Sequence, residues 1–394
     1  MGPIGKDSFE SNEYINMTVF LHSFFLIMVS MPSLFIVSGY NGFYFFGLTL
    51  PVATLLFQIK DLTYVVKIPK KIVLSILILL FSSVINSVSA SFMHLALHLL
   101  FLLIIISFYN YETNNNNILL TKTIRFIFIT YSILVLIVSF LHIIGQLWIV
   151  PGFIYLFDDG DIRILIFSTE PSYLSFLIFI MYRYLTYNNQ NKLYLLIAVL
   201  VMILTKSMFG LVLSVFAIVS YFLLSTKDIK FFSGSLFIFL ALLLIVTSII
   251  PEYYLNRIIE LLNADGAIDS YGTFSIRILP VIFFYEQVMS NPMILLFGEG
   301  SNSMNIEFYN SIGYQYTSND SLSTHMAGFL YDYGIFPSLL VASHIIQHGI
   351  KNKILSIILL ILISLNSSFG TYLFLFYVLL EQSIKLNSRR GVYA

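Results

Sequence analysis

The sequence predicts an all-α polytopic integral membrane protein with about 12 transmembrane helices. Of its 394 residues, 58% are hydrophobic and only 10% are charged, whereas soluble domains carry about 25% charged residues. Apolar stretches recur along the chain, and a hydrocarbon core about 30 Å thick needs about 20 helical residues to cross it. The chain has no cysteine, which excludes disulfides, thiolate catalysis and Cys-based metal sites.

The apolar stretches divide into successive spans. The start, Met1–Asn16, is polar, so we expect no cleavable signal peptide, and the first apolar run is long enough to remain as a span. Residues 193–226 are too long for one upright span, and we divide them at Lys206–Gly210 because a lone ammonium in mid-bilayer is costly. The expected spans are 17–38, 42–58, 71–88, 90–109, 124–147, 164–187, 192–206, 209–226, 231–250, 321–346, 353–367 and 369–384.

The basic residues give these spans an orientation. All but four of the 20 Lys and Arg residues fall on one side, which is the cytoplasmic side because basic loops stay there. Both termini are then cytoplasmic. The four cations expected outside, among most of the acidic residues, are Arg163, Lys206, Arg257 and Arg277.

The spans define three regions. Residues 1–250 form an N-terminal transmembrane bundle of about nine spans, 251–320 a large outer loop, and 321–394 the C-terminal spans and a basic tail. Long loops are usually functional. Within this loop, Tyr253–Asn263 and Phe274–Met289 have helical, amphipathic patterning, and we expect them to lie on the outer leaflet or cap a cavity.

Three of the outer cations are candidates for binding an anion. The guanidinium of Arg277 offers a fork of donors that matches phosphate oxygens. Arg163 is either a similar ligand or a headgroup anchor at the mouth of the sixth span. Lys206 either reaches an anionic group or closes a hairpin between two short helices.

Two residues are candidates for a general base. Glu170 is expected about a turn and a half inside the sixth span, where Pro171 would kink the helix; the alternative is a structural ion pair with Lys206 or Arg163. His325 opens the tenth span, and Asp332 lies two helical turns further on the same face, about 10 Å away. A neutral imidazole at the outer face accepts a proton near pH 7.

The sequence predicts no cofactor, no metal site and no nucleic-acid partner. A phosphate-binding glycine loop, a nucleotide fold and a DxD-like cation site are all missing from the sequence. His94 and His98 have the spacing of a metal-binding pair, but neither an acid nor a cysteine completes the site, so packed polar contacts are the favoured interpretation.

Four segments in this order resemble the Wzy-type O-antigen polymerases, which belong to the broad family that also contains the O-antigen ligases. They are Phe167–Tyr173, Leu204–Ser207, the long outer loop that carries Arg277 before Phe297–Gly300, and Thr324–Ile335. The resemblance covers nearly the full length and includes the layout of about 12 spans.

This resemblance implies a metal-independent membrane glycosyltransferase in the bacterial inner membrane, with its active site facing the periplasm. Its donor would be a glycan on undecaprenyl pyrophosphate, and its acceptor another undecaprenyl-pyrophosphate-linked repeat unit. A membrane protein that regulates chain length would be a partner. On this basis Arg277, Arg163 and Lys206 would bind the pyrophosphate, with Arg277 also catalytic, and His325 or Glu170 would be the base. The supporting residues would be Asp332, Ser172 and Tyr173.

Two alternatives stay open at this point. One is an O-antigen ligase that uses the same donor, although the double-histidine pattern of ligases is missing around His325. The other is a flippase for lipid-linked oligosaccharides, for which we would expect cations deep in the central helices, short loops and two similar halves.

Overall fold

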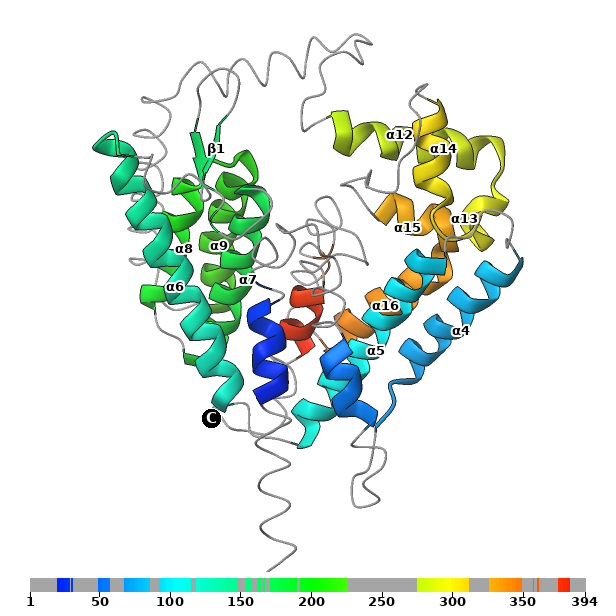
Figure 1. Ribbon diagram of the computed structural model, residues 1–394, viewed down its shortest axis with the longest axis horizontal. Helices are drawn as coiled ribbons and strands as arrows, with labels where there is room; N and C mark the ends of the chain where they lie inside the picture. The colour runs from blue at the N-terminus through cyan, green and yellow to red at the C-terminus, as the bar shows by residue number, and fades with distance from the viewer. Residues whose placement is uncertain are drawn as a thin grey trace, which may run out of the picture.

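The computed structural model describes a predominantly helical protein (Figure 1). This confirms the predicted helical class, with the addition of one short two-stranded hairpin. The described residues are 20–28, 30, 49–56, 67–85, 92–114, 118–146, 154–156, 162–164, 166, 171–189, 192–225, 275–311, 326–348, 357, 360 and 375–382.

Two groups of packed helices stand on either side of the molecule in Figure 1. In the first group, α7 packs on α6, α8 and α9, and a hairpin of strands β1 and β2 lies at its upper end. The second group packs α16 on α4, and α4 on α5, below a cap of short helices. The elements of the first group are α6 (Ile118–Ile143), β1 (Ile154–Leu156), β2 (Ile162–Ile164), α7 (Pro171–Asn189), α8 (Lys192–Leu204) and α9 (Met208–Ser225). Those of the second are α4 (Lys70–Ile85), α5 (Phe92–Asn114) and α16 (Ile335–His348).

The cap belongs to residues 251–320, the loop that the sequence predicts to lie outside, and to the segment that follows it. Phe283, Ile294, Met304, Phe308 and Tyr331 form its own small apolar cluster. The cap and the β1–β2 hairpin lie at the same end of the helices (Figure 1). The cap consists of α12 (Ser275–Ser290), α13 (Met293–Phe297), α14 (Ser303–Ser311) and α15 (Met326–Tyr333).

Several predicted elements are present. The chain breaks between α8 and α9 around Lys206, where the sequence placed the break. Lys206 has φ 53°, in the left-handed region, which no helix interior accommodates. The amphipathic helix expected at Phe274–Met289 is α12, whereas Tyr253–Asn263 lies outside the described residues.

Other details of the prediction are wrong. Pro171 does not kink the sixth span but is the first residue of α7, a position where its fixed φ and missing N–H cost nothing. Glu170 therefore precedes this helix. The single span expected at 321–346 is two helices, since Gly334 (φ 76°) separates α15 from α16. Residues 162–164, in or beside the expected sixth span, form strand β2.

Within the described residues, one segment, Leu120–Ile143 of α6, has both the length and the apolar composition of a membrane span. Shorter apolar helices cover His94–Asn110, Lys192–Leu204, Phe209–Tyr221 and Ile335–Ile346. The twelve-span topology therefore stays a prediction.

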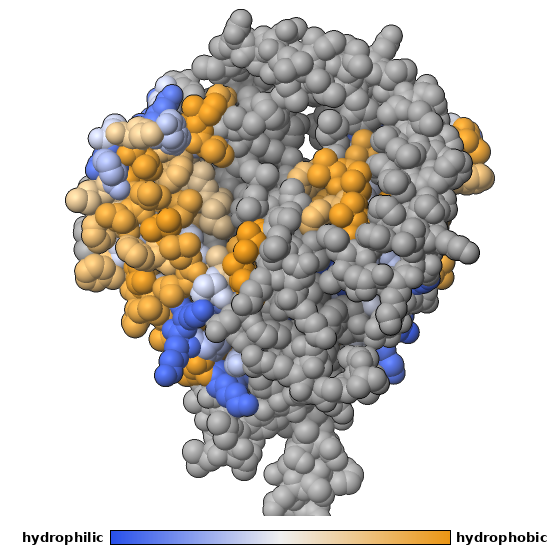
Figure 2. Space-filling view, turned by 180° about the vertical axis from the view of Figure 1, so that it is seen from behind, coloured by the Kyte–Doolittle hydropathy of each residue, from blue (hydrophilic) through white to orange (hydrophobic). Residues whose placement is uncertain are grey.

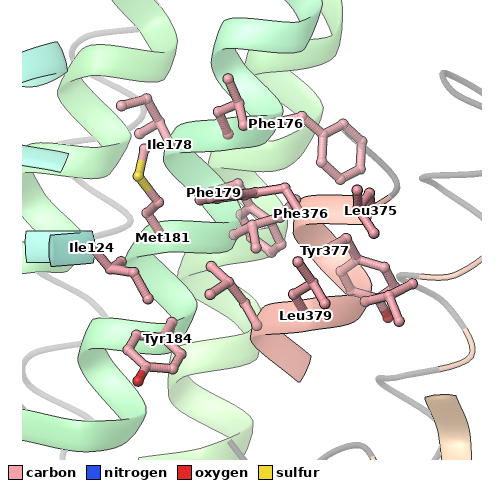
Figure 3. Close-up of a cluster of buried hydrophobic side chains, with 14 of the residues drawn as sticks. Ile124, Phe176, Ile178, Phe179, Met181, Tyr184, Leu375, Phe376, Tyr377 and Leu379 are labelled. Carbon is pink, nitrogen blue, oxygen red and sulfur yellow. The ribbon is translucent and has the colours of Figure 1, made fainter. Parts of the chain in front are cut away.

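Two further helical segments, residues 20–28 and 375–382, lie between the two groups (Figure 1). Figure 3 shows Phe376 and Leu379 among the aromatic and aliphatic side chains of α7, including Phe176 and Phe179. One turn below, Arg183 of α7 forms an ion pair with Glu381, with 3.0 Å between Nη2 and Oε1. Both side chains are at most 5% exposed.

The ion pair is incompletely satisfied. Among the described residues, Nε and Nη1 of Arg183, Oε2 of Glu381 and the side-chain amide of Gln382 have no hydrogen-bond partner. Removing one partner of a buried pair leaves an isolated charge, which typically costs about 3–5 kcal/mol, whereas replacing both by apolar residues is often neutral.

We therefore expect Glu381→Leu to lower the thermal unfolding midpoint of the purified protein strongly, because it leaves the buried guanidinium of Arg183 without its carboxylate partner. The double variant Arg183→Met/Glu381→Leu should recover most of the loss. A double variant no more stable than Glu381→Leu alone would show that the attraction within the pair exceeds the free-energy cost of burying the two charges.

Candidate functional site

The first part of the candidate site is the turn between α8 and α9. Its Lys206 is half-buried, and 3.4 Å separate its Nζ from Nε2 of His142 near the end of α6. A lysine ammonium only donates, so Nε2 of His142 accepts and its proton sits on the other nitrogen. The pair brings a cation to the end of the first helix group that also carries the β1–β2 hairpin (Figure 1).

Close helix packing holds this turn. The hydroxyls of Ser175 and Thr205 lie 2.8 Å apart, and Thr205 also donates to the carbonyl of Met202 over 2.7 Å. A Cβ on Gly210 would meet both the Met202 carbonyl oxygen and the Ser175 hydroxyl at 2.6 Å. Only glycine therefore lets α9 approach α7 and α8 this closely, and the three helices fix the backbone on both sides of Lys206.

The neighbouring candidates come from the hairpin and from the start of α7. Arg163 is a residue of β2 and pairs with Tyr155 of β1 in an antiparallel register. Ser172 and Tyr173 occupy the first turn of α7, and both are buried, at 6% and 8% exposure. Glu170 lies outside the described residues.

The second part of the site is the cap, and Asp332 is its central residue. The Asp332 carboxyl is buried and accepts hydrogen bonds from the backbone N–H groups of Asn302 (2.8 Å) and Met304 (3.0 Å). These N–H groups belong to the start of α14, where the first turn of a helix has no partners of its own. Asp332 was predicted as a supporting residue of the site, and here it ties α15 to α14.

A close backbone contact, which we call the glycine clasp, joins residues 298–300 to residues 331–334. The N–H groups of Glu299 and Gly300 donate to the carbonyls of Tyr331 (2.8 Å) and Asp332 (2.9 Å). A Cβ on Gly298 would lie 2.4 Å from the Asp332 carbonyl oxygen, and one on Gly334 would lie 2.4 Å from that of Leu296. This contact gives the Phe297–Gly300 segment of the resemblance a structural role.

The clasp is anchored to α4 and α5. The hydroxyl of Ser82 donates to the carbonyl of Phe297 over 2.9 Å, and Nδ1 of His98 lies 2.9 Å from the hydroxyl of Tyr333. The ring of His98 also contacts Phe329 edge-on. His98 therefore makes packed polar contacts, as expected, and the described residues contain no group of three side chains that would hold a metal.

The cap also carries acidic side chains. Tyr331 donates its hydroxyl to Glu307 over 2.5 Å. Partial burial, and secondly the Glu307 carboxylate, raise the pKa of Glu299. Glu299 therefore takes up a proton more readily than a free glutamate.

Of the two strongest sequence candidates, Arg277 belongs to the cap, and neither side chain is described. Arg277 lies in the first turn of α12, and His325 immediately precedes α15 but falls outside the described residues. The two helices pack together, with Phe283 of α12 against Tyr331 of α15. The fold thus packs α12, which carries Arg277, against α15, which follows His325 in the sequence. Arg277 and His325 are 48 positions apart in the chain.

Sequence reasoning missed His142 and Tyr333. His142 contacts a lysine 64 residues away, and Tyr333 a histidine 235 residues away. Neither has a local pattern that would indicate its partner.

No protein-family model, curated protein or solved structure matches the chain.

The glycine clasp predicts a sharp difference between glycines. Gly298→Ala and Gly334→Ala should each destabilise the protein by a few kcal/mol, because a left-handed backbone alone costs a non-glycine residue roughly 1–2 kcal/mol and the new methyl also meets backbone. The matched control is Gly328→Ala inside α15, where the nearest atom to an added Cβ is 3.8 Å away. Thermal unfolding midpoints and limited proteolysis of the cap would check this; equal effects at all three positions would contradict it.

Proposed function

We propose that the chain is an O-antigen polymerase of the Wzy type, a metal-independent membrane glycosyltransferase that acts at the outer face of the bacterial inner membrane. It transfers the growing polysaccharide from undecaprenyl pyrophosphate to the non-reducing end of a lipid-linked repeat unit. The observation that carries the proposal is the arrangement in Figure 1: the Lys206 turn with the hairpin of Arg163, and the cap with Arg277, lie at the same end of two helix groups.

The chemistry needs fixed cations and one base. The acceptor hydroxyl oxygen attacks the anomeric carbon of the donor, the carbon–oxygen bond to pyrophosphate breaks, and the electron pair leaves with the pyrophosphate. Fixed cations in a site of low dielectric constant stabilise this developing charge. The hydroxyl proton passes to a base, for which His325 and Glu170 are the candidates.

The rigidity of the supporting elements favours this assignment. The backbone of Lys206 is fixed between α8 and α9, and α12 and α15 share the apolar cluster of the cap. Positioned groups on rigid elements are the arrangement that electrostatic catalysis requires, because a loose cation reorganises with the charge instead of stabilising it.

Two other functions would use similar surfaces. An O-antigen ligase would take the same donor and differ in its acceptor, a lipid A core. A flippase for lipid-linked oligosaccharides would need a path through the centre of the protein. The cap, a compact unit at one end with its own apolar cluster, favours chemistry at one membrane face over passage across it.

The function is tested by complementation of a strain that makes the matching lipid-linked repeat units but lacks its polymerase. Wild type should restore a lipopolysaccharide ladder, whereas Arg277→Ala, His325→Ala and Lys206→Met should leave core plus one repeat. Lys206→Arg should keep a ladder, because it preserves the charge that the pyrophosphate needs.

Membrane amounts of each variant would be compared by immunoblot. A wild type that gives no ladder in its matched background would overturn the polymerase assignment. Full ladders from the Arg277 and His325 variants would overturn the site. Loss of even the single capped repeat would indicate a ligase or a flippase.

A further inference from the structure

The depth of α13 in the membrane can be estimated from its distance to the basic residues at the lower end of the second helix group. Lys67 and Lys70 are exposed at the lower end of the second helix group, and the side chain of Asn110 binds the backbone of Lys67 (2.6 Å and 3.0 Å). Lys67, Lys70 and Asn110 therefore lie at one level. This level is the cytoplasmic boundary in the topology on which the proposed function rests.

The number of residues along α4 and along α5 gives the height of the clasp above this boundary. Along α4, 12 residues separate Lys70 from Ser82, which binds the carbonyl of Phe297; along α5, 12 residues separate Asn110 from His98, which binds Tyr333. At 1.5 Å per residue, each path rises about 18 Å. Helix tilt only lowers this height. A hydrocarbon core is about 30 Å thick, so the clasp lies inside it, near its midplane.

The backbone polar groups of the clasp are paired and buried, as a position inside the membrane requires. Irregular backbone at membrane depth is tolerated where its polar groups are paired and covered by protein. Gly298, Gly300, Ser301 and Asn302 are all buried. The hydrogen-bonded N–H groups of this stretch are those of Gly298, Glu299, Gly300, Asn302 and Ser303.

The exposed side chains of α13 and of one face of α12 are apolar. On α13, Met293 is 60% exposed and Phe297 56%. On α12, Tyr285 and Met289 are exposed on one face, and Glu286 lies at its edge. On α4, Leu77 is likewise 56% exposed. Figure 2, seen from behind, shows on its left a broad hydrophobic surface over this group, with hydrophilic side chains at its lower and upper ends.

We propose that α13 is embedded in the hydrocarbon core and that α12 rises from it towards the outer interface, so this part of the loop contacts acyl chains instead of water. The depth of the clasp, its paired backbone and the broad hydrophobic surface in Figure 2 all argue for lipid as the occupant. An amphipathic helix with an apolar face and a polar edge is typical of this location. The substrate site would then border the leaflet that holds the polyprenyl tail of the donor.

The natural absence of cysteine makes the depth directly measurable. Single-cysteine variants at Tyr285, Met293 and Phe297 would carry nitroxide labels in proteoliposomes, and power saturation would compare collisions with oxygen and with a water-soluble nickel chelate. Leu77→Cys on α4 is the hydrocarbon control, and Gln146→Cys, exposed just beyond the end of α6, is the aqueous control.

We expect labels at positions 293 and 297 to show an oxygen-to-nickel ratio several-fold above that at 146, with 297 deeper than 285. A ratio at 297 equal to that at 146 would overturn the proposal and place α13 in water. Low collision rates with both reagents would also overturn it, because a second protein copy would then cover the strip. A failed complementation assay with lipid-like ratios would overturn the polymerase alone, whereas an aqueous ratio at 77 would overturn the membrane topology itself.

Discussion

The glycine clasp is the contact on which the cap end of the second helix group depends. Asp332 acts on both sides of it: its side chain accepts the first N–H groups of α14, and its carbonyl accepts from Gly300. The contact is possible because Gly298 and Gly334 have no Cβ. Two short helices, α13 and α14, gain their position from α15 in this way, since helices of five and nine residues are too short to be stable alone.

Two buried charged groups are held differently. In the cap, Asp332 is matched by backbone donors whose positions are fixed by the helix that they begin. The ion pair of Arg183 and Glu381 leaves guanidinium and carboxylate atoms unpaired within the described residues. A fully matched carboxyl adds rigidity, whereas an incompletely matched pair mainly penalises any change that separates its partners. The contact at Asp332 is thus the more rigidly specified of the two.

Apolar length and charge distribution allowed the helical class, most helix positions and the break at Lys206 to be predicted. The predictions failed where a tertiary contact decides the backbone. Gly334 interrupts a stretch that is apolar enough for one helix, because the clasp requires a left-handed residue there. Pro171 is compatible with either a kinked or a starting helix, and in the structure it is the first residue of α7. The partners of His142 and Tyr333 were unpredictable, because each contact joins helices distant in sequence.

The placement of the candidate residues follows from the same contacts. Arg277 lies in the first turn of α12, and His325 stands immediately before α15. Residues at the ends of helices are more accessible to a substrate than residues in helix interiors. Their positions are fixed only as well as the helix to which they are attached. Because α15 has eight residues, its own helical propensity cannot fix it. Its position comes from Asp332, from Tyr333 against His98, and from Gly334 against α13. The position of α15, the helix that follows His325 in the sequence, therefore depends on the clasp.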